Sequence, residues 1–234
     1  MSAPAVIFFD LDGCLVDSTR AITGAMNHAL TSLNLPPRPL AGLTRFIGPP
    51  LMESFATLLR EAGADAGLAP ACVDAYRERY RTSSLEDTEV IAGMPEALDR
   101  LSSSSSRLGV VTSKPLLFAV PILERVGLRE RFVAVHGPDA DHRVEPKTVT
   151  LARALADIGE AADAASAVMV GDRSHDVIAG RACGIATVGV TWGAGDRAEL
   201  VDAGADHVVD SAAELVALFE GARSQPLPRA GRRD

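Results

Sequence analysis

The sequence predicts a doubly wound α/β protein, in which helices cover both faces of a parallel β-sheet, with an all-helical subdomain inserted after the first strand. Two observations predict this fold class. Short apolar runs rich in β-branched residues alternate with helical patterns, as expected for strands buried on both faces of a parallel sheet. One long stretch interrupts the alternation, because helical patterns follow one another there without an intervening strand.

The expected strands are short apolar runs bounded by Gly, Asp, Thr or Ser. The first spans residues 6–9 (VIFF) and leads directly into acidic residues. Five further runs of the same kind cover residues 108–111, 132–135, 167–170, 186–190 and 207–209. The helical patterns between them cover residues 95–101, 116–126, 149–158, 176–183 and 212–220. Pro95 stands where proline fits the first turn of a helix.

The interruption covers residues 18–90, where Pro- and Gly-rich loops separate helical patterns at residues 20–33, 50–62 and 70–80. We therefore expect a helical insert of residues 18–90 and an α/β core formed by residues 1–17 and 91–222. Residues 223–234 (RSQPLPRAGRRD, counted from Arg223) are rich in Pro and Arg, and they are expected to be disordered. The serine run at residues 102–106 is expected to be a polar surface loop.

Composition argues against several classes of protein. The chain has 234 residues and a net charge of −8, which disfavours binding to nucleic acid or to an anionic membrane through bulk charge. No apolar run approaches the roughly 20 residues of a membrane span, and the N-terminus lacks the basic region of a signal peptide. The three cysteines, Cys14, Cys72 and Cys183, form no disulfide framework. We expect a cytoplasmic protein.

Polar residues follow the expected strands, and in an open parallel sheet ligands bind beyond the carboxyl ends of the strands. The set combines acids, hydroxyls and the only two lysines among 23 basic residues. Its members are Asp10 and Asp12 after the first strand, Thr112, Ser113 and Lys114 after the second, Lys147 beyond the third, and Asp172 and Asp176 after the fourth. Carboxylates suit Mg²⁺, and hydroxyl, amide and ammonium groups suit a phosphate.

Each of these features also has an ordinary structural interpretation. Two acids at a strand end can cap a turn, and Thr112 and Ser113 can be N-cap residues at the start of a helix. Asp176 lies four residues after Asp172, a spacing that returns it to the same side of a helix. An acid in that position is also stabilised by the helix dipole without any metal.

The ordered motifs decide between these interpretations. They are D-x-D-G-x-L-x-D-S at residues 10–18, T-S-K at residues 112–114 and G-D-R-S-H-D at residues 171–176. Together they resemble the haloacid dehalogenase superfamily of phosphohydrolases over residues 5–215. The helical insert is similar to the cap of the subgroup that contains phosphoglycolate phosphatases and β-phosphoglucomutases. The stretch VGVTWGAGDRAELVDAGADHVVDSAAEL, residues 188–215, resembles the phosphoglycolate phosphatase-like branch.

The resemblance implies a Mg²⁺-dependent phosphomonoester hydrolase that acts on a small organic phosphate. It implies that Asp10 is the nucleophile that forms an aspartyl-phosphate, and that Asp12 is the general acid and base. Asp172 would complete the Mg²⁺ shell with the Asp10 carboxylate and the Asp12 backbone carbonyl. Asp176 would bind the metal directly or through water.

The phosphate would be held by Thr112 and the Ser113 backbone N–H. Lys147 would neutralise the nucleophile and the phosphate together. Lys114 is the alternative holder of that role, or else it contacts the far end of the substrate. The Pro146-Lys147 order departs from the Lys-Pro order that is common in the family.

Substrate recognition is expected in the insert, where Arg45 and Gly48 lie in a loop that resembles the substrate-facing loop of this subgroup. Arg45 either reads a substrate carboxylate through its planar fork or is a solvated surface residue. Arg173 and His175 are expected to face solvent or the cap, without a catalytic role. Cys14 stands where the family usually has Thr, which places a thiol beside the nucleophile.

Other functions on the same fold stay open to different degrees. A phosphosugar mutase keeps the same core, and a non-catalytic phospho-ligand-binding protein is possible because fold does not determine function. A dehalogenase is disfavoured because Asp12 supplies a phosphatase-type acid. A phosphonatase is disfavoured because residues 18–90 contain no lysine for a Schiff base. The expected partner is a small phosphate ester, and the expected state is a monomer or a homodimer.

Overall fold

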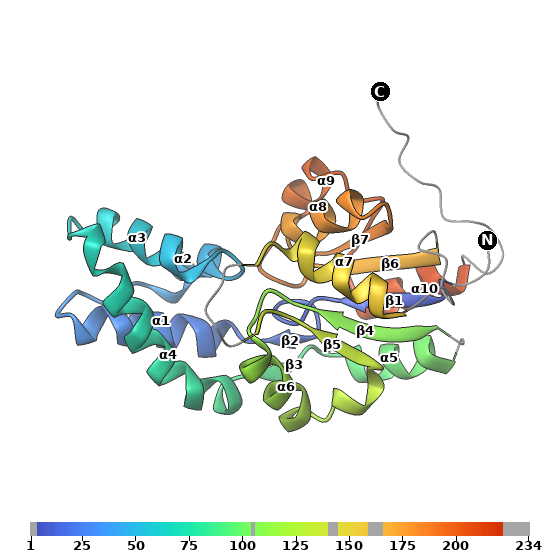
Figure 1. Ribbon diagram of the computed structural model, residues 1–234, viewed down its shortest axis with the longest axis horizontal. Coiled ribbons are helices and arrows are strands. Elements are labelled where there is room, and N and C mark those ends of the chain that lie inside the picture. The colour runs from blue at the N-terminus through green and yellow to red at the C-terminus, as the bar shows by residue number, and fades with distance from the viewer. Residues whose placement is uncertain (1–3, 104–105, 140–144, 159–165, 222–234) are drawn as a thin grey trace. The chain divides into compact units, whose positions relative to one another are not determined.

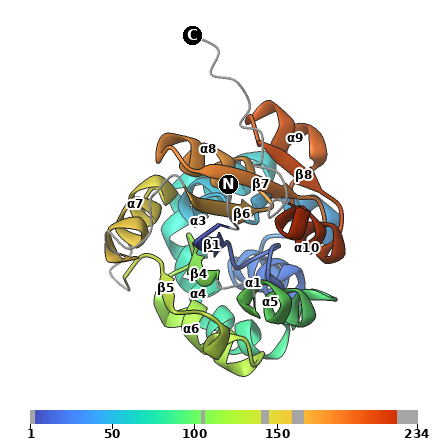
Figure 2. The ribbon, with the colours of Figure 1, turned by 90° about the vertical axis from the view of Figure 1, so that its right-hand side faces the viewer.

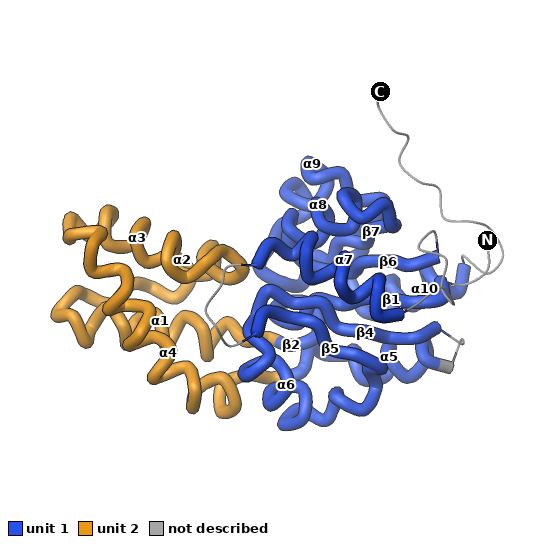
Figure 3. Tube along the Cα trace, in the orientation of Figure 1, with its two compact units in different colours: residues 1–16, 90–234 blue, residues 17–89 orange. Residues whose placement is uncertain are grey.

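The computed structural model describes residues 4–103, 106–139, 145–158 and 166–221 (Figure 1). The chain divides into two compact units, one formed by residues 1–16 and 90–234 and the other by residues 17–89 (Figure 3). The boundaries expected from the sequence differ from these by one residue. The C-terminal stretch 223–234, for which disorder is predicted, lies outside the described residues.

The first unit contains a parallel sheet whose six described strands run in the order β5-β4-β1-β6-β7-β8. The strands are β1 (Val6–Phe9), β4 (Arg107–Val111), β5 (Ala134–His136), β6 (Ala167–Gly171), β7 (Ala186–Val190) and β8 (His207–Val209). All five strand pairs are parallel. This doubly wound, Rossmann-like arrangement confirms the predicted fold class, and β1 lies in the interior of the sheet.

Helices cover both faces of this sheet. Those described are α5 (Met94–Ser103), α6 (Leu116–Arg125), α7 (Lys147–Ile158), α8 (Ser174–Ala182), α9 (Arg197–Asp202) and α10 (Ala212–Gly221). Helices α7 and α8 pack side by side, and α5 packs beside α10 on the other side of the strands (Figure 2). Sequence patterns missed α9, which has only six residues and is too short for a clear apolar period. The serine loop expected at residues 102–106 is partly wrong, because α5 continues to Ser103.

The core beneath α7 and α8 consists of buried apolar side chains from the strands and from these helices. Its members include Phe8, Val111, Leu151 and Met169. The Phe8 ring occupies the space beside the next strand, because a Cβ built on Gly109 would lie 2.9 Å from a ring carbon of Phe8. Glycine at position 109 therefore lets a large side chain pack against the backbone of β4.

The second unit is helical apart from its two ends. It contains α1 (Thr19–Ser32), α2 (Leu40–Leu43), α3 (Leu51–Glu61) and α4 (Ala69–Glu86), with short 3₁₀ turns η1 (Thr44–Phe46) and η2 (Ala66–Leu68). Its core stacks Tyr76 on Tyr80 at 5.1 Å between ring centroids, and Phe55 meets Tyr76 edge-on.

The chain passes from one unit to the other within two short strands. These are β2 (Val16–Asp17) and β3 (Glu89–Val90), which pair as a two-stranded sheet. No strand is predicted from the sequence between residues 18 and 91, so β3 (Glu89–Val90) is a small correction. Two residues are too few for an alternating pattern to be visible.

None of the helices that the structure describes is both long enough and apolar enough to cross a bilayer.

Replacement of Phe8 tests the packing of the core. Phe8 is 1% exposed, so Phe8→Ala removes a buried ring and leaves a cavity. We expect the free energy of unfolding to fall by about 3–5 kcal/mol, measured by urea denaturation at neutral pH. Leu117→Ala, at a position that is 45% exposed, is the control and is expected to change it by about 0.5 kcal/mol. Equal effects of the two substitutions would contradict this account of the core.

Candidate active site

Strand register brings the sequence motifs together at one edge of the sheet. Phe9 of β1 is level with Val110 of β4 and with Val170 of β6. The residues that follow these strands therefore leave the sheet at the same level. Asp10 N–H donates to the Val170 carbonyl at 2.9 Å, which continues the β1–β6 ladder by one residue.

Three carboxylates converge there and are buried. Asp10, Asp172 and Asp176 each offer an oxygen, and these atoms all lie within 4.8 Å of one another. The side chains are withdrawn from water, with residue exposures of 8% or less. Among the described residues, Oδ1 of Asp172 has no hydrogen-bond partner. Buried charged oxygens without donors are costly, so the arrangement calls for a cation.

The protonation behaviour of two of these acids reflects the same crowding. Burial raises the pKa of Asp10 to about 6; Asp176 and Asp12 add to the rise, and Lys147 opposes it. Burial also raises the pKa of Asp172 to about 8, and the charges of Asp176 and Asp10 add to the effect. Both carboxylates are thus short of positive charge. A hard divalent cation such as Mg²⁺ fits three such oxygens, which are its preferred ligands.

Lys147 supplies part of the missing charge. Its Nζ lies 2.8 Å from Asp10 Oδ1, and the same ammonium pairs with Asp176 Oδ1. Burial alone would lower the pKa of Lys147, but the charges of Asp10 and Asp176 outweigh it and raise that pKa above its ordinary value. Lys147 opens α7. Lys147 therefore contacts Asp10 and Asp176 although Pro146 precedes it, the reverse of the Lys-Pro order common in the family.

The other lysine has a different partner. Lys114 Nζ forms an ion pair with Asp12 Oδ1 at 2.6 Å, and its side chain is 7% exposed. Lys147 therefore pairs with Asp10, and Lys114 pairs with Asp12. In this structure Lys114 holds the second acid of the first motif.

Residues 112–114 form a turn at the end of β4. Thr112 is buried, its N–H donates to the His136 carbonyl at 2.9 Å, and its Oγ1 accepts from Lys114 N–H at 3.1 Å. Ser113 is exposed. Neither residue is the N-cap of α6, because Pro115 occupies that position without a side-chain cap. The capping interpretation of Thr112 and Ser113 is therefore wrong.

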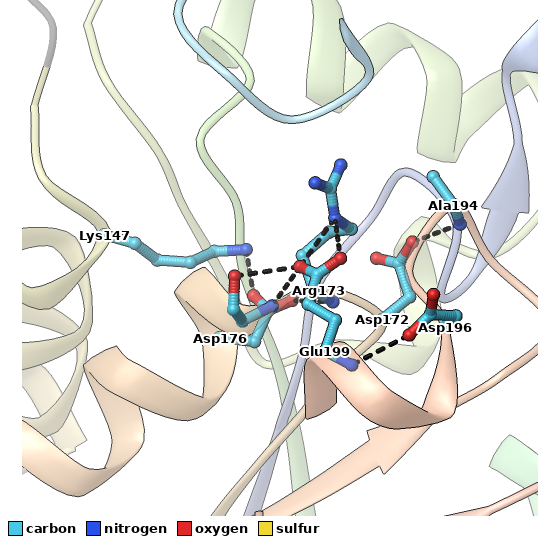
Figure 4. A network of polar contacts seen from close by, with 8 residues as sticks. Lys147, Asp172, Arg173, Asp176, Ala194, Asp196 and Glu199 are labelled. Atoms are coloured by element: carbon cyan, nitrogen blue, oxygen red, sulfur yellow. Dashed lines mark hydrogen bonds and ion pairs between the residues drawn. The ribbon is translucent and has the colours of Figure 1, made fainter. Parts of the chain in front are cut away.

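The loop after β7 closes over Asp172, as Figure 4 shows. Ala194 N–H donates to Asp172 Oδ2 at 2.7 Å. A Cβ on Gly13 or on Gly193 would lie 2.2 Å from the same oxygen, so only glycine fits at these two positions. Sequence reasoning gave this loop no role in the site. The signal that could have found it is its place at a strand's carboxyl end, with two glycines in GAGD.

Arg173 and Asp176 are linked through the first turn of α8. Arg173 N–H donates to Asp176 Oδ2 at 3.0 Å. The Arg173 side chain is 15% exposed and its Nε lies 3.0 Å from Glu199 Oε1. The expectation that Arg173 faces solvent or the cap is therefore wrong, because α9, which the sequence did not reveal, supplies a partly buried anionic partner. His175 is exposed, as expected.

Cys14 lies close to these acids but has an inert environment. It is fully buried, and burial together with the nearby charges of Asp10 and Asp172 raises the pKa of its thiol well above the ordinary value. The thiol is therefore protonated at neutral pH, which argues against a reactive cysteine. Trp192 Nε1 donates to the Cys14 carbonyl at 3.1 Å, so the backbone here helps to hold the β7 loop.

Arg45 and Gly48 belong to the unit of residues 17–89. Arg45 pairs with both oxygens of Glu61 at 2.6 Å and lies 4.6 Å from the centroid of the Phe46 ring. Its side chain is 58% exposed. Gly48 adopts a left-handed backbone with φ of 104°, which favours glycine in this loop. In this structure the Arg45 guanidinium is therefore already paired with the carboxylate of Glu61.

Glu145 anchors the start of α7, the helix that carries Lys147. Its carboxylate accepts from Thr150 Oγ1 at 2.6 Å and from Arg153 at 3.0 Å. Arg153 also donates to the Gly137 carbonyl at 2.9 Å, which ties α7 to the segment after β5. Burial raises the pKa of Glu145, but the hydrogen bonds from Thr150 and Arg153 lower it further, so that it falls below its ordinary value.

The contribution of the Glu145 charge to the free energy of unfolding depends on pH in a predictable direction. A lowered pKa means that folding favours the ionised carboxylate, so its contribution is complete above the ordinary pKa of 4.5 and is lost as the pH falls through the lower folded value. We expect Glu145→Gln to lower the free energy of unfolding at pH 7, and the difference from wild type to shrink below pH 4.5. Urea denaturation between pH 7 and pH 4 measures this. A difference that is the same at every pH would contradict it.

Comparison with known proteins agrees with this site. The chain belongs to the haloacid dehalogenase-like hydrolase family, whose model matches residues 7–190. A crystal structure described as that of a predicted phosphatase from Clostridium acetobutylicum superposes with a TM-score of 0.85 at 31% identity, covering 94% of this chain and 100% of that chain. The resemblance stated from the motifs is thereby confirmed, and the protein is a phosphatase-type hydrolase of this family.

Relatives of similar identity carry different names. A 5'-nucleotidase of Pseudomonas aeruginosa is 37% identical over 194 residues, covering 83% of this chain and 86% of that protein. The tyrosine-protein kinase PtkA of Mycobacterium tuberculosis is 36% identical over 218 residues, covering 93% and 72%. A phosphoglycolate phosphatase of Agrobacterium fabrum is 33% identical over 219 residues, covering 91% of each. Family membership therefore leaves the substrate open.

Proposed function

We propose that this protein is a Mg²⁺-dependent phosphomonoester hydrolase that acts on a small organic phosphate through an aspartyl-phosphate on Asp10. The observation that carries the proposal is the buried Asp10 carboxylate, which lies 2.8 Å from Lys147 Nζ and within 4.8 Å of oxygens of Asp172 and Asp176. Such a group is held in place, is partly neutralised, and lies at the carboxyl edge of the sheet, where substrates bind in this fold.

The metal would be held by side-chain oxygens of Asp10, Asp172 and Asp176, together with the Asp12 backbone carbonyl that the resemblance implies. When bound, Mg²⁺ supplies the positive charge that offsets the repulsion between a carboxylate nucleophile and an anionic phosphoryl group. The unpartnered Oδ1 atom of Asp172 supports this assignment, because that buried oxygen lacks a donor.

The chain's own residues would carry the chemistry in two steps. In the first, an Asp10 carboxylate oxygen attacks phosphorus, the ester P–O bond breaks, and Asp12 gives its proton to the departing alkoxide. In the second, Asp12 takes a proton from water, the water oxygen attacks phosphorus, and inorganic phosphate leaves Asp10. Lys147 favours the ionised form of Asp10 before the attack and holds that side chain in place.

The residues around this pair would orient the substrate. Thr112 and the Ser113 N–H are proposed to bind phosphate oxygens from the turn after β4. Lys114 holds the Asp12 carboxylate at 2.6 Å, so it fixes the position of the proposed acid before the substrate binds. Lys114 would remain beside the phosphate during the transfer.

Phosphoglycolate is the first candidate substrate. The motif after β7 and the relative named phosphoglycolate phosphatase support it. Nucleoside monophosphates form the second candidate, because the relative with 37% identity is named 5'-nucleotidase. Sugar phosphates are the third. A phosphosugar mutase would share the same acids and would transfer phosphate poorly to water.

Phosphate release from a panel of small esters tests the proposal directly. The panel contains phosphoglycolate, β-glucose 1-phosphate and several nucleoside monophosphates, each assayed with Mg²⁺ and with excess chelator. We expect one clear preference among the esters, and loss of release with chelator that is restored when Mg²⁺ is added back. A folded protein that releases phosphate from none of them would contradict the hydrolase and favour a mutase or a binding role.

Removal of the nucleophile gives the sharper test. Asp10→Asn keeps the size of the side chain but removes the attacking carboxylate, so we expect phosphate release to fall by at least about 10³-fold with the fold retained. Circular dichroism checks the fold. Asp99→Asn is the matched control, because it makes the same change at an exposed carboxylate that pairs with Arg131. Wild-type turnover in Asp10→Asn would rule out the aspartyl-phosphate.

A further inference from the structure

Glu199 of α9 is a partly buried carboxylate beside the three clustered acids, and neither the motifs nor the proposed chemistry account for it. Its carboxylate accepts hydrogen bonds from two consecutive residues at the start of α8 (Figure 4). The donors are Ser174 N at 2.8 Å, Ser174 Oγ at 2.8 Å and Arg173 Nε at 3.0 Å. Burial raises the pKa of Glu199, but these hydrogen bonds and the Arg173 charge lower it overall. Glu199 is therefore an anion at neutral pH.

The residues that Glu199 holds are those that join two of the acids. Arg173 and Ser174 lie between Asp172 and Asp176 in the chain. Arg173 N–H also donates to Asp176 Oδ2 at 3.0 Å, so the orientation of Asp176 follows the position of the Arg173 backbone. A displacement of this turn would change the spacing between the Asp172 and Asp176 carboxylates.

The segment that leads into α9 holds Asp172 from its other side. Ala194 N–H donates to Asp172 Oδ2 at 2.7 Å, and a Cβ on Gly195 would lie 2.0 Å from the Asp172 carbonyl oxygen. Asp196 then caps α9, because its Oδ1 accepts from Glu199 N at 2.8 Å. Residues 194–199 thus contact Asp172 at one end and the turn after Asp172 at the other.

Glu199 also balances a charge that would otherwise compete with a metal. Arg173 directly follows Asp172, and its guanidinium is largely withdrawn from water. Its Nε is paired with the Glu199 carboxylate. Without that carboxylate, the nearest acids in the sequence are Asp172 and Asp176 themselves. A guanidinium turned toward either would oppose the binding of a cation.

We propose that Glu199 is a positioning residue for metal binding: it fixes the turn between Asp172 and Asp176 and keeps Arg173 away from their carboxylates. The inference rests on the proposed function in one respect, namely that these acids bind Mg²⁺. Outer-shell groups that orient metal ligands typically contribute about 10–100-fold to metal affinity.

The test measures binding of Mg²⁺ alone by isothermal titration calorimetry, so it does not depend on turnover. We expect Glu199→Ala to raise the Kd for Mg²⁺ by about 10–100-fold. Glu199→Gln keeps an oxygen that can accept from Ser174 but loses the charge that pairs with Arg173, and a smaller rise is expected. The matched control is Glu220→Gln on α10, which breaks an exposed pair with Arg100 of α5 and is expected to leave the Kd unchanged.

A second readout separates positioning from general stability. If Glu199 acts through the metal site, phosphate release by Glu199→Gln recovers to near the wild-type kcat at saturating Mg²⁺, while the Mg²⁺ concentration for half-maximal rate is raised. An unchanged Kd for Mg²⁺ in both Glu199 variants would overturn the inference. Mg²⁺ binding by a wild-type protein that hydrolyses no ester would overturn the proposed function and leave the Glu199 comparison intact.

Discussion

The burial of three carboxylates around one ammonium group is the constraint on which the rest of this structure depends. Asp10, Asp172 and Asp176 lie within 4.8 Å of one another, and Lys147 is the cation that contacts two of them. Desolvation and mutual repulsion raise the pKa of Asp10 to about 6 and that of Asp172 to about 8. The positive charge of Lys147 offsets part of this cost, and the proposed divalent cation would offset more of it.

The surrounding elements keep these charges in place rather than adding chemistry of their own. Parallel pairing of β1 with β6 brings Asp10 and Asp172 to the same edge of the sheet, because residues 9 and 170 are level. The β7 loop donates to Asp172 through Ala194, and Glu145 anchors the helix that carries Lys147. Each anchor lies on a different element, so the site forms only when the whole unit has folded.

Specificity has a different origin from the reaction. Relatives between 33% and 37% identical carry the names of a nucleotidase, a tyrosine kinase and a phosphoglycolate phosphatase. Members of one family can act on different phosphate esters, because a shared fold does not fix the substrate. Discrimination then depends on groups that contact the rest of the substrate. For Arg45, which is paired with Glu61 in the helical unit, a role in substrate recognition stays a prediction.

The sequence by itself determined the features that are local along the chain: the strand runs, the acids that follow them and the helical insert. Asp10 and Asp12 could be identified because they follow a buried strand, and Asp172 and Asp176 because they follow another expected strand and are four positions apart. Only the tertiary structure decided that Lys147, not Lys114, contacts Asp10, and that Arg173 pairs with Glu199, 26 residues away. Such pairings depend on how loops of unequal length return to the sheet, and no local pattern of residues encodes that path.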